Sequence, residues 1–160
     1  FTKKYADMIG RELNAKVIAL DKVNKKMLTD YEIIIYGGSL HAVGIIGIDK
    51  IKSILKQIPD KKFIVFATGA SPKKEGILEE IKKNNFAESK PTKLFYLRGG
   101  FNFKKLDAIN KITMFVFINF LKLKSKKSPD EKGMISAYKT SVDFTNKDNI
   151  VDLINYIKRI

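Results

Sequence analysis

The chain has 160 residues, the length of one ordinary domain, and is long enough to bury about two-thirds of the surface that it would expose unfolded. It contains no cysteine, which excludes disulfides, thiolate metal sites and cysteine nucleophiles; with no visible signal peptide, we expect an intracellular, cytoplasmic protein. The formal net charge of +14 rests on 28 lysines but only three arginines, and this shortage of arginine argues against specific nucleic-acid binding.

The first predicted element is a helix over residues 1–13, with Thr2 placed to cap it. Its apolar side chains recur at helical spacing and define one buried face: Tyr5, Ile9 and Leu13. Ala15–Leu20 then predicts a short strand, and residues 21–30 form a polar connection that includes about one helical turn.

The run Glu32–Tyr36 is too short for a helix and rich in β-branched residues, so it predicts a buried strand. Gly37 and Gly38 follow at once and predict a loop, after which Ile48–Ile58 predicts a helix that ends at Pro59. A strand, a glycine loop and a helix in this order make the unit on which α/β proteins build ligand sites.

Two further strands show the same arrangement. Lys62–Thr68 ends in the small residues of 69–72, a helix is predicted over Lys74–Asn84, and Lys93–Arg98 ends in Gly99 and Gly100. The alternation of strands and helices predicts a doubly wound α/β domain with a parallel sheet. Three glycine loops at equivalent strand ends then predict a shared pocket along the carboxyl edge; the alternative is that short connections simply require small residues.

Residues 102–127 interrupt this pattern. Ile112–Leu121 is almost wholly apolar, but these ten residues are too few to span a bilayer, which takes roughly 20 as a helix. Lysines lie on both sides of the run: Lys104, Lys105, Lys111, Lys122, Lys124, Lys126 and Lys127. Such a segment suits an anionic membrane interface, whereas the alternative is a helix packed on its own domain or in a dimer.

The positive charge has two further explanations, namely general solubility and a biased genome composition that enriches isoleucine, lysine and asparagine together.

After the apolar run, residues 125–130 predict a turn, and residues 131–144 an extended segment near the last glycine loop. Residues 148–160 predict a closing amphipathic helix with Ile150, Leu153, Ile154 and Ile157 toward the sheet.

These motifs resemble the flavodoxin-like family. FTKKYADMIGREL is similar to the first flavodoxin helix directly after the phosphate loop, of whose pattern the final threonine is present as Thr2. YGGSLHAVG and FATGAS resemble the two loops that enclose the flavin ring. RGGFNFKKLDAINKITMFVFINFLK is most similar to the menaquinone-dependent, flavodoxin-like protoporphyrinogen oxidase branch, in which a glycine loop leads into a basic, aromatic insert.

The resemblance implies a single flavodoxin-like domain over residues 1–160, with strand order 2-1-3-4-5 and an insert at about 102–127. In that order the first strand is central and its following loop holds the flavin phosphate. A chain that begins at the first helix would lack both, so we expect about 10 to 15 further residues upstream in the natural protein.

The resemblance also implies that FMN is the cofactor and suggests where it binds. The candidate cofactor-binding residues are Thr2, Gly38, Ser39, Leu40, His41, Thr68, Gly69, Ala70, Arg98, Gly99 and Gly100. Thr2 would lie by the phosphate at a helix start, and Arg98 could hold a substrate carboxylate or stabilise reduced flavin. The alternatives are a structural ion pair for Arg98 and ordinary solvation for His41, the one histidine.

The expected function is that of an FMN-binding redox protein. Since flavodoxins that carry electrons are typically acidic, the basic composition favours a membrane-associated oxidoreductase, which we expect at the inner membrane face with a quinone or other redox partner. The resemblance to the protoporphyrinogen oxidase branch implies a porphyrin-like substrate. The alternatives are a generic electron carrier and a non-enzymatic module that binds anions or membranes. A receiver domain would need clustered acidic residues, and a hydrolase a G-x-S-x-G elbow; neither motif is present, and the sequence indicates no catalytic set or metal site.

Overall fold

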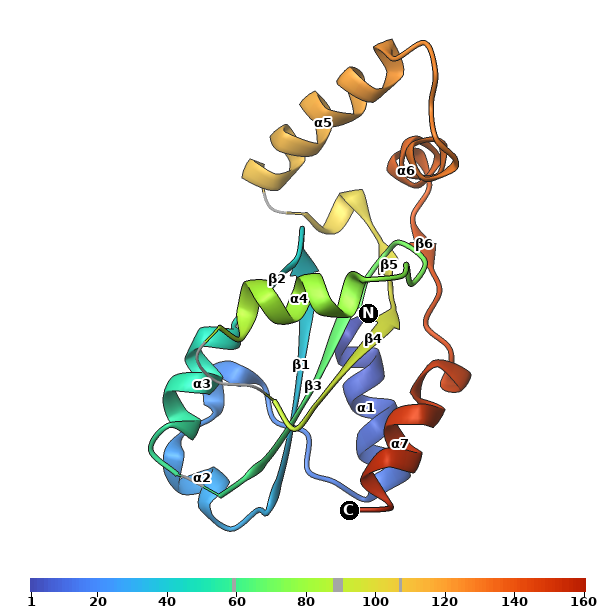
Figure 1. Cartoon of the computed structure of the whole chain (residues 1–160). Helices are drawn as coiled ribbons and strands as arrows, with labels where there is room; N and C mark the ends of the chain where they lie inside the picture. The colour runs from blue at the N-terminus through green and yellow to red at the C-terminus, as the bar shows by residue number, and fades with distance from the viewer. Residues whose placement is uncertain (59, 88–90, 107) are drawn as a thin grey trace.

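The computed structural model describes residues 1–58, 60–87, 91–106 and 108–160. Its centre is a mixed sheet in the order β2-β1-β3-β4 (Figure 1). The strands β1 (Ile33–His41), β3 (Lys62–Gly69) and β4 (Lys93–Arg98) run parallel, and β2 (Gly44–Ile45) is antiparallel to the end of β1. The helices around it are α1 (Thr2–Leu13), α2 (Lys25–Thr29), α3 (Ile48–Leu55), α4 (Ile77–Asn85) and α7 (Val151–Ile157).

The side chains of the central strands alternate between two apolar cores, one on each face of the sheet. One face carries Val65 of β3 and is covered by α2, α3 and α4; the other carries Phe66 and is covered by α1 and α7. Figure 1 shows these two groups of helices on opposite sides of the sheet. Because β3 lies between two strands and under helices on both faces, residues 63–68 are all buried, and the predicted doubly wound α/β class is confirmed.

The strand predicted at Ala15–Leu20 was wrong. Residues 15–19 have no regular structure, and Leu20–Lys22 forms a 3₁₀ turn. The first of these residues closes the end of α1, since the Ala15 N–H donates to the Gly10 carbonyl at 2.8 Å. None of the six side chains is buried, so the segment gains little from lying in a sheet, and the four-stranded sheet does not show the expected order 2-1-3-4-5.

The loop predicted at Gly37 and Gly38 was also wrong, because β1 continues through both glycines to His41 before turning back into β2. The reason is packing: a Cβ on Gly37 would lie 2.1 Å from Cζ of the buried Phe66. Glycine is therefore required here by the close approach of a neighbouring ring and not by a turn.

Several helix ends differ from the predicted ones. Phe1, not Thr2, is the N-cap of α1, and α3 ends at Leu55, while Pro59, expected to stop it, lies outside the described residues. The helix predicted over Lys74–Asn84 is α4, which begins three residues later behind Gly76. The closing helix begins as a 3₁₀ turn, Lys147–Ile150, capped by Asn146, and continues as α7.

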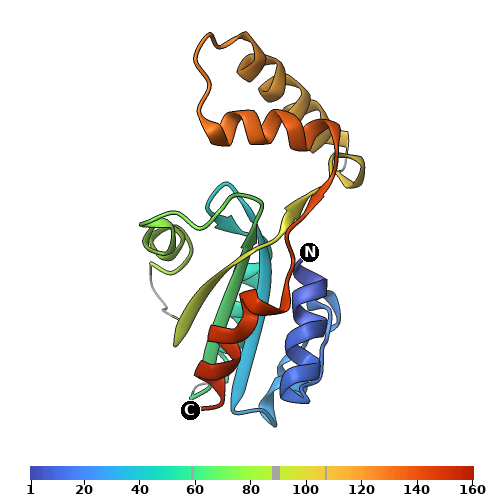
Figure 2. The ribbon, with the colours of Figure 1, turned by 90° about the vertical axis from the view of Figure 1, so that its right-hand side faces the viewer.

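The segment after β4 forms a helical hairpin beyond the carboxyl ends of the strands. Its helices are α5 (Ala108–Leu123) and α6 (Pro129–Lys139), and its neck is a ribbon of β5 (Gly100–Phe101) and β6 (Val142–Asp143). Figure 2 shows the hairpin projecting from the sheet domain through this neck. Residues 131–144 are thus mostly helical and not extended as predicted, because Ser128 and Glu131 form a capping box that starts α6.

Candidate functional site

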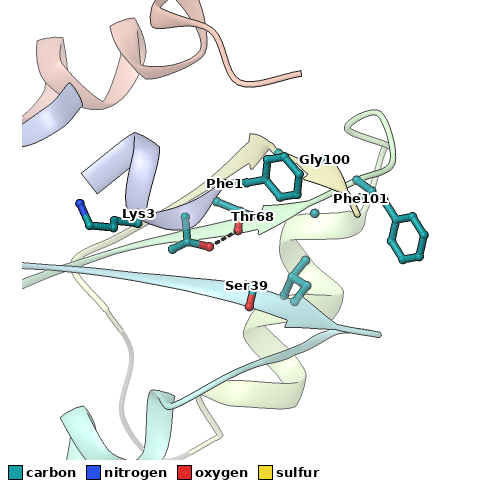
Figure 3. A pocket seen from close by; sticks show the side chains of 11 residues that line it. Phe1, Lys3, Ser39, Thr68, Gly100 and Phe101 are labelled. Carbon is teal, nitrogen blue, oxygen red and sulfur yellow. Dashed lines mark hydrogen bonds between the residues drawn. The ribbon is translucent and has the colours of Figure 1, made fainter. Parts of the chain in front are cut away.

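A cavity of 360 Å³ lies at the carboxyl edge of the three parallel strands, close to the start of α1 (Figure 3). The ends of β1, β3 and β4 and the first residues of α1 and β5 contribute to its wall. The lining residues are Phe1, Thr2, Lys3, Ser39, Leu40, Thr68, Gly69, Ala70, Gly99, Gly100 and Phe101. Its volume is at the lower end of the roughly 300–1,000 Å³ that is usual for small-molecule sites.

Hydroxyl groups from three elements gather in this wall. The Oγ1 atoms of Thr2 and Thr68 are 2.6 Å apart and hydrogen-bonded, so the start of α1 is fixed to the end of β3 (Figure 3). Ser39, at the end of β1, is exposed beside them. Thr68 is buried, and its hydroxyl is also 3.5 Å from the Gly38 carbonyl.

The start of α1 provides a positive field at the cavity. No side chain caps the helix, and its first turn has no acidic residue. The two lysines of this turn are already paired, Lys3 with Asp7 at 2.7 Å and Lys4 with Asp143, so the field comes from the backbone of the helix start. The backbone N–H groups of a helix start bind anions, and the helix dipole adds to this preference. An anionic group in the cavity next to Thr2 would therefore find donors and no competing carboxylate in that turn.

Close packing around Gly100 shapes the opposite wall. A Cβ on Gly100 would lie 2.2 Å from the Val142 carbonyl oxygen and 2.6 Å from Cε1 of Phe1, so no other residue fits without movement. Figure 3 shows the Phe1 ring at Gly100, with Phe101 beyond it and Lys3 pointing away from these rings. The cavity thus combines glycine backbone, two aromatic rings and hydroxyls, which suits a planar polar ligand.

Arg98 lies behind this wall and does not line the cavity. Its guanidinium carbon is 3.7 Å from the centre of the Phe144 ring, and its Nε donates to the Ala70 carbonyl at 3.4 Å. Its own carbonyl accepts a hydrogen bond from the hydroxyl of the fully buried Tyr5. These contacts join the ends of β3 and β4 to the chain that returns from the hairpin.

A second tyrosine supports the loop after β3. Burial raises the pKa of Tyr96, although the charge of Arg98 opposes the shift, and its hydroxyl donates to the Ser71 carbonyl at 2.6 Å. A Cβ on Gly69 would lie 2.5 Å from the Tyr96 hydroxyl oxygen. The tyrosine therefore stays neutral and holds the loop 69–71 in place from outside the cavity.

Of the eleven predicted site residues, the structure places eight in the cavity wall: Thr2, Ser39, Leu40, Thr68, Gly69, Ala70, Gly99 and Gly100. Three lie elsewhere. Gly38 is buried within β1, where a Cβ would meet Ile45 at 2.3 Å; His41 is exposed at the end of the same strand; and Arg98 is placed as described above.

Sequence reasoning did not identify three lining residues, Phe1, Lys3 and Phe101. Phe101 had a usable signal, because it directly follows the glycine pair at the end of β4. Lys3 follows Thr2 at the helix start, so its place in the lining could have been inferred, although its ammonium group pairs with Asp7. Phe1 carries no signal of its own, since only the fold brings its ring to Gly100.

Among the residues that the structure describes, no group of three or more His, Asp or Glu side chains could hold a metal ion. No helix in the described ranges is long and apolar enough to cross a membrane.

A doubly wound α/β sheet with a cavity at the carboxyl ends of its strands, beside a helix start, defines a domain of the class that binds nucleotide-like cofactors. A family model described as a flavodoxin domain matches residues 1–130, and the chain belongs to this family. Domains of the family typically bind FMN and suggest a redox function. Comparison with curated proteins gave no match.

Proposed function

We propose that the protein is an FMN-dependent oxidoreductase of the protoporphyrinogen oxidase type. The observation that carries this proposal is the cavity itself, in which hydroxyls, glycine backbone and an uncapped helix start meet at the carboxyl edge of the sheet. FMN would supply the electron and hydride chemistry, so the protein needs no nucleophile of its own.

The lining residues divide into two groups according to the part of FMN that they suit. The N–H groups at the start of α1 and the Thr2 hydroxyl suit the phosphate because they can donate hydrogen bonds. Residues from the three strand ends suit the flavin ring, since their glycines let the backbone approach a flat molecule: Ser39, Leu40, Gly69, Ala70, Gly99 and Gly100.

The substrate that we propose is a lipophilic porphyrinogen with carboxylate groups, and the acceptor is a quinone. In each two-electron step the substrate loses two electrons and two protons, and the quinone takes up both to become a quinol. Arg98 is the proposed partner of a propionate. Within the described residues, its guanidinium hydrogen bond to Ala70 uses Nε, and the side chain is only half-buried, so the two terminal nitrogens can donate to a carboxylate.

Flavin titration tests the cofactor. We expect the protein to quench FMN fluorescence, and the Gly99→Val variant to bind at least about tenfold more weakly. The reason is that a Cβ at Gly99 already lies 3.2 Å from Cβ of Phe1, so a larger side chain fills the cavity. Gly133→Val is the matched control, since a Cβ there meets nothing within 4 Å. Native-like circular dichroism without any quenching would reject the flavin proposal.

Turnover tests the reaction. We expect the FMN-loaded protein to oxidise protoporphyrinogen with a quinone acceptor, and Arg98→Ala to raise KM more than it lowers kcat. Arg159→Ala, at an exposed position near the C-terminus, is the control and should change neither value. No turnover, together with ready electron exchange with a flavodoxin reductase, would instead assign the protein as a generic electron carrier.

A further inference from the structure

One face of α5 is apolar and exposed along its whole length. Five large side chains, spaced three or four residues apart, form this stripe: Ile109, Ile112, Val116, Phe120 and Leu123. At this spacing they point to the same side of a helix. The end residues are among the most exposed apolar side chains of the described chain, with 77% of Ile109 and 85% of Leu123 accessible. Phe115 and Phe117 are exposed on either side of the stripe.

The opposite face of α5 is already occupied. Ile118 and Leu121 are buried, and α5 packs against α6 within the hairpin. Outside α5, the large exposed apolar residues of the described ranges are distributed over several elements and do not form such a row: Val17, Tyr31, Ile46, Met134, Phe144, Val151 and Ile160. Burial of the stripe therefore requires something outside the hairpin.

The hairpin is also strongly basic. Residues 102–140 contain nine lysines and three acidic residues, an excess of six positive charges, and no arginine. Lys111 and Lys122 lie on α5 itself, and further lysines precede and follow it. Glu131 is not free to bind another cation, since its carboxylate is 2.6 Å from Nζ of Lys124 and accepts from the Ser128 N–H at 2.7 Å.

We propose that this stripe docks on a lipid bilayer surface that contains anionic lipids. The apolar side chains would enter the boundary between headgroups and acyl chains, and the lysines that precede and follow the helix would meet the lipid phosphates. The helix would lie in the plane of the interface, because only one of its faces is free.

The composition favours lipid over a protein partner. Protein interfaces are enriched in arginine and depleted in lysine, whereas this hairpin has nine lysines and no arginine. A second copy of the chain is also disfavoured, since two stripes in contact would bring together two hairpins that each carry six excess positive charges.

Docking would also orient the molecule. The hairpin projects from the end of the sheet at which β1, β3 and β4 end, the same end that carries the cavity (Figures 1 and 2). The cavity would therefore lie on the membrane side of the domain. This orientation suits a lipophilic substrate under the proposed function, but the docking itself does not depend on flavin binding.

Vesicle sedimentation of the protein without FMN tests the inference. We expect binding to phosphatidylcholine vesicles that contain phosphatidylserine, little binding to pure phosphatidylcholine, and a steep loss between about 0.05 and about 0.5 M salt as the charges are screened. The variant Ile112→Ser/Val116→Ser/Phe120→Ser should reduce the partition coefficient at least about tenfold. The control Ile46→Ser/Val151→Ser/Ile160→Ser removes exposed apolar side chains elsewhere and should change it less than about twofold.

A second pair of variants separates local charge from net charge. Lys104→Gln/Lys105→Gln/Lys126→Gln should weaken binding to anionic vesicles more than Lys25→Gln/Lys26→Gln/Lys83→Gln, although both variants lose three charges from exposed positions. Circular dichroism and thermal unfolding of each variant establish that the fold is retained.

Equal binding to neutral and anionic vesicles, or unchanged binding of a folded stripe variant, would overturn the proposal. A concentration-dependent dimer that the stripe variant abolishes, without vesicle binding by the original protein, would assign the face to a second copy instead. Since none of these measurements involves flavin, their outcome is independent of the FMN titration.

Discussion

At the scale of single residues, Tyr5 connects three segments that meet under the cavity wall. Its ring is fully buried, and its hydroxyl donates to the Arg98 carbonyl at the end of β4. The same oxygen accepts from Nδ2 of Asn149 at 2.6 Å, which brings in the turn before α7. The tyrosine therefore stabilises the place where the strand ends and the lining glycines begin.

Tyr5→Phe should destabilise the protein by about 1–3 kcal/mol, because it leaves a carbonyl and an amide without the hydroxyl that satisfies them. Urea unfolding measures the change. Tyr31→Phe is the control, since this side chain is 41% exposed and its loss should cost little. Equal effects of the two substitutions would show that the buried hydroxyl contributes nothing beyond the ring.

At the scale of elements, the buried strands were the most predictable part of the fold. Lys93–Arg98 is confirmed residue for residue and Lys62–Thr68 to within one residue, because their apolar runs are bounded by lysines and glycines. The strand at Ala15–Leu20 failed, since a short apolar run does not reveal whether a neighbouring strand exists. In contrast, the error at α6 was avoidable, because its capping box is visible in the sequence at Ser128 and Glu131.

The candidate site was predictable to the extent that it lies at strand ends. Parallel strands place their carboxyl ends at one edge, so eight lining residues could be chosen from the three glycine-containing segments. Gly38 could not be excluded from sequence, because its neighbour Ile45 faces it only after β1 turns back into β2. Likewise, the distance from Arg98 to Phe144 depends on the path of the hairpin.

The neck of the hairpin contains a titratable contact. Asp143 of β6 accepts a hydrogen bond from Nζ of Lys4 in α1 and others from Thr145, and these bonds, that from Lys4 foremost, lower its pKa from 3.8 to about 2. Because the pKa is lower in the folded than in the unfolded protein, the contact adds to stability above pH 3.8, and the contribution is lost as the pH falls toward 2.

Asp143→Asn should therefore reduce the loss of stability between pH 3.8 and about 2, measured as the free energy of unfolding in urea. The effect will be modest, since 38% of this side chain is exposed and solvent screens the pair. Lys4→Met should reduce the same slope, and the double variant should add little to either change. An acid slope identical to that of the original protein would contradict the assignment.

At the scale of the whole molecule, the hairpin and the sheet domain have separate interiors. The buried Ile118 and Leu121 of α5 belong to neither of the two cores that cover the sheet. The two strands of the neck pair with each other and not with the main sheet, and Phe101 and Val142 lie opposite one another in this antiparallel ribbon. The sheet domain thus does not depend on the hairpin for its core.

Replacing residues 102–141 with Asn-Gly should leave a folded sheet domain, since a two-residue turn joins paired ends of an antiparallel ribbon. We expect an unfolding temperature within a few degrees of that of the original protein, because the core of the sheet domain is unchanged, and a weaker helical circular dichroism signal. Replacing the same residues with a long glycine-serine linker is the control for the turn. An aggregated or molten product from both variants would show that the hairpin is needed for folding.

The neck has a mechanical consequence. The chain leaves for the hairpin through Gly100 in the cavity wall and returns to Phe144, whose N–H donates to the Gly99 carbonyl at 2.8 Å. A paired ribbon bends far less than a glycine-serine linker of the same length. The hairpin is therefore a lever arm with its fulcrum at Gly99, and a force on its far end is transmitted as torque to the strand ends that surround the cavity.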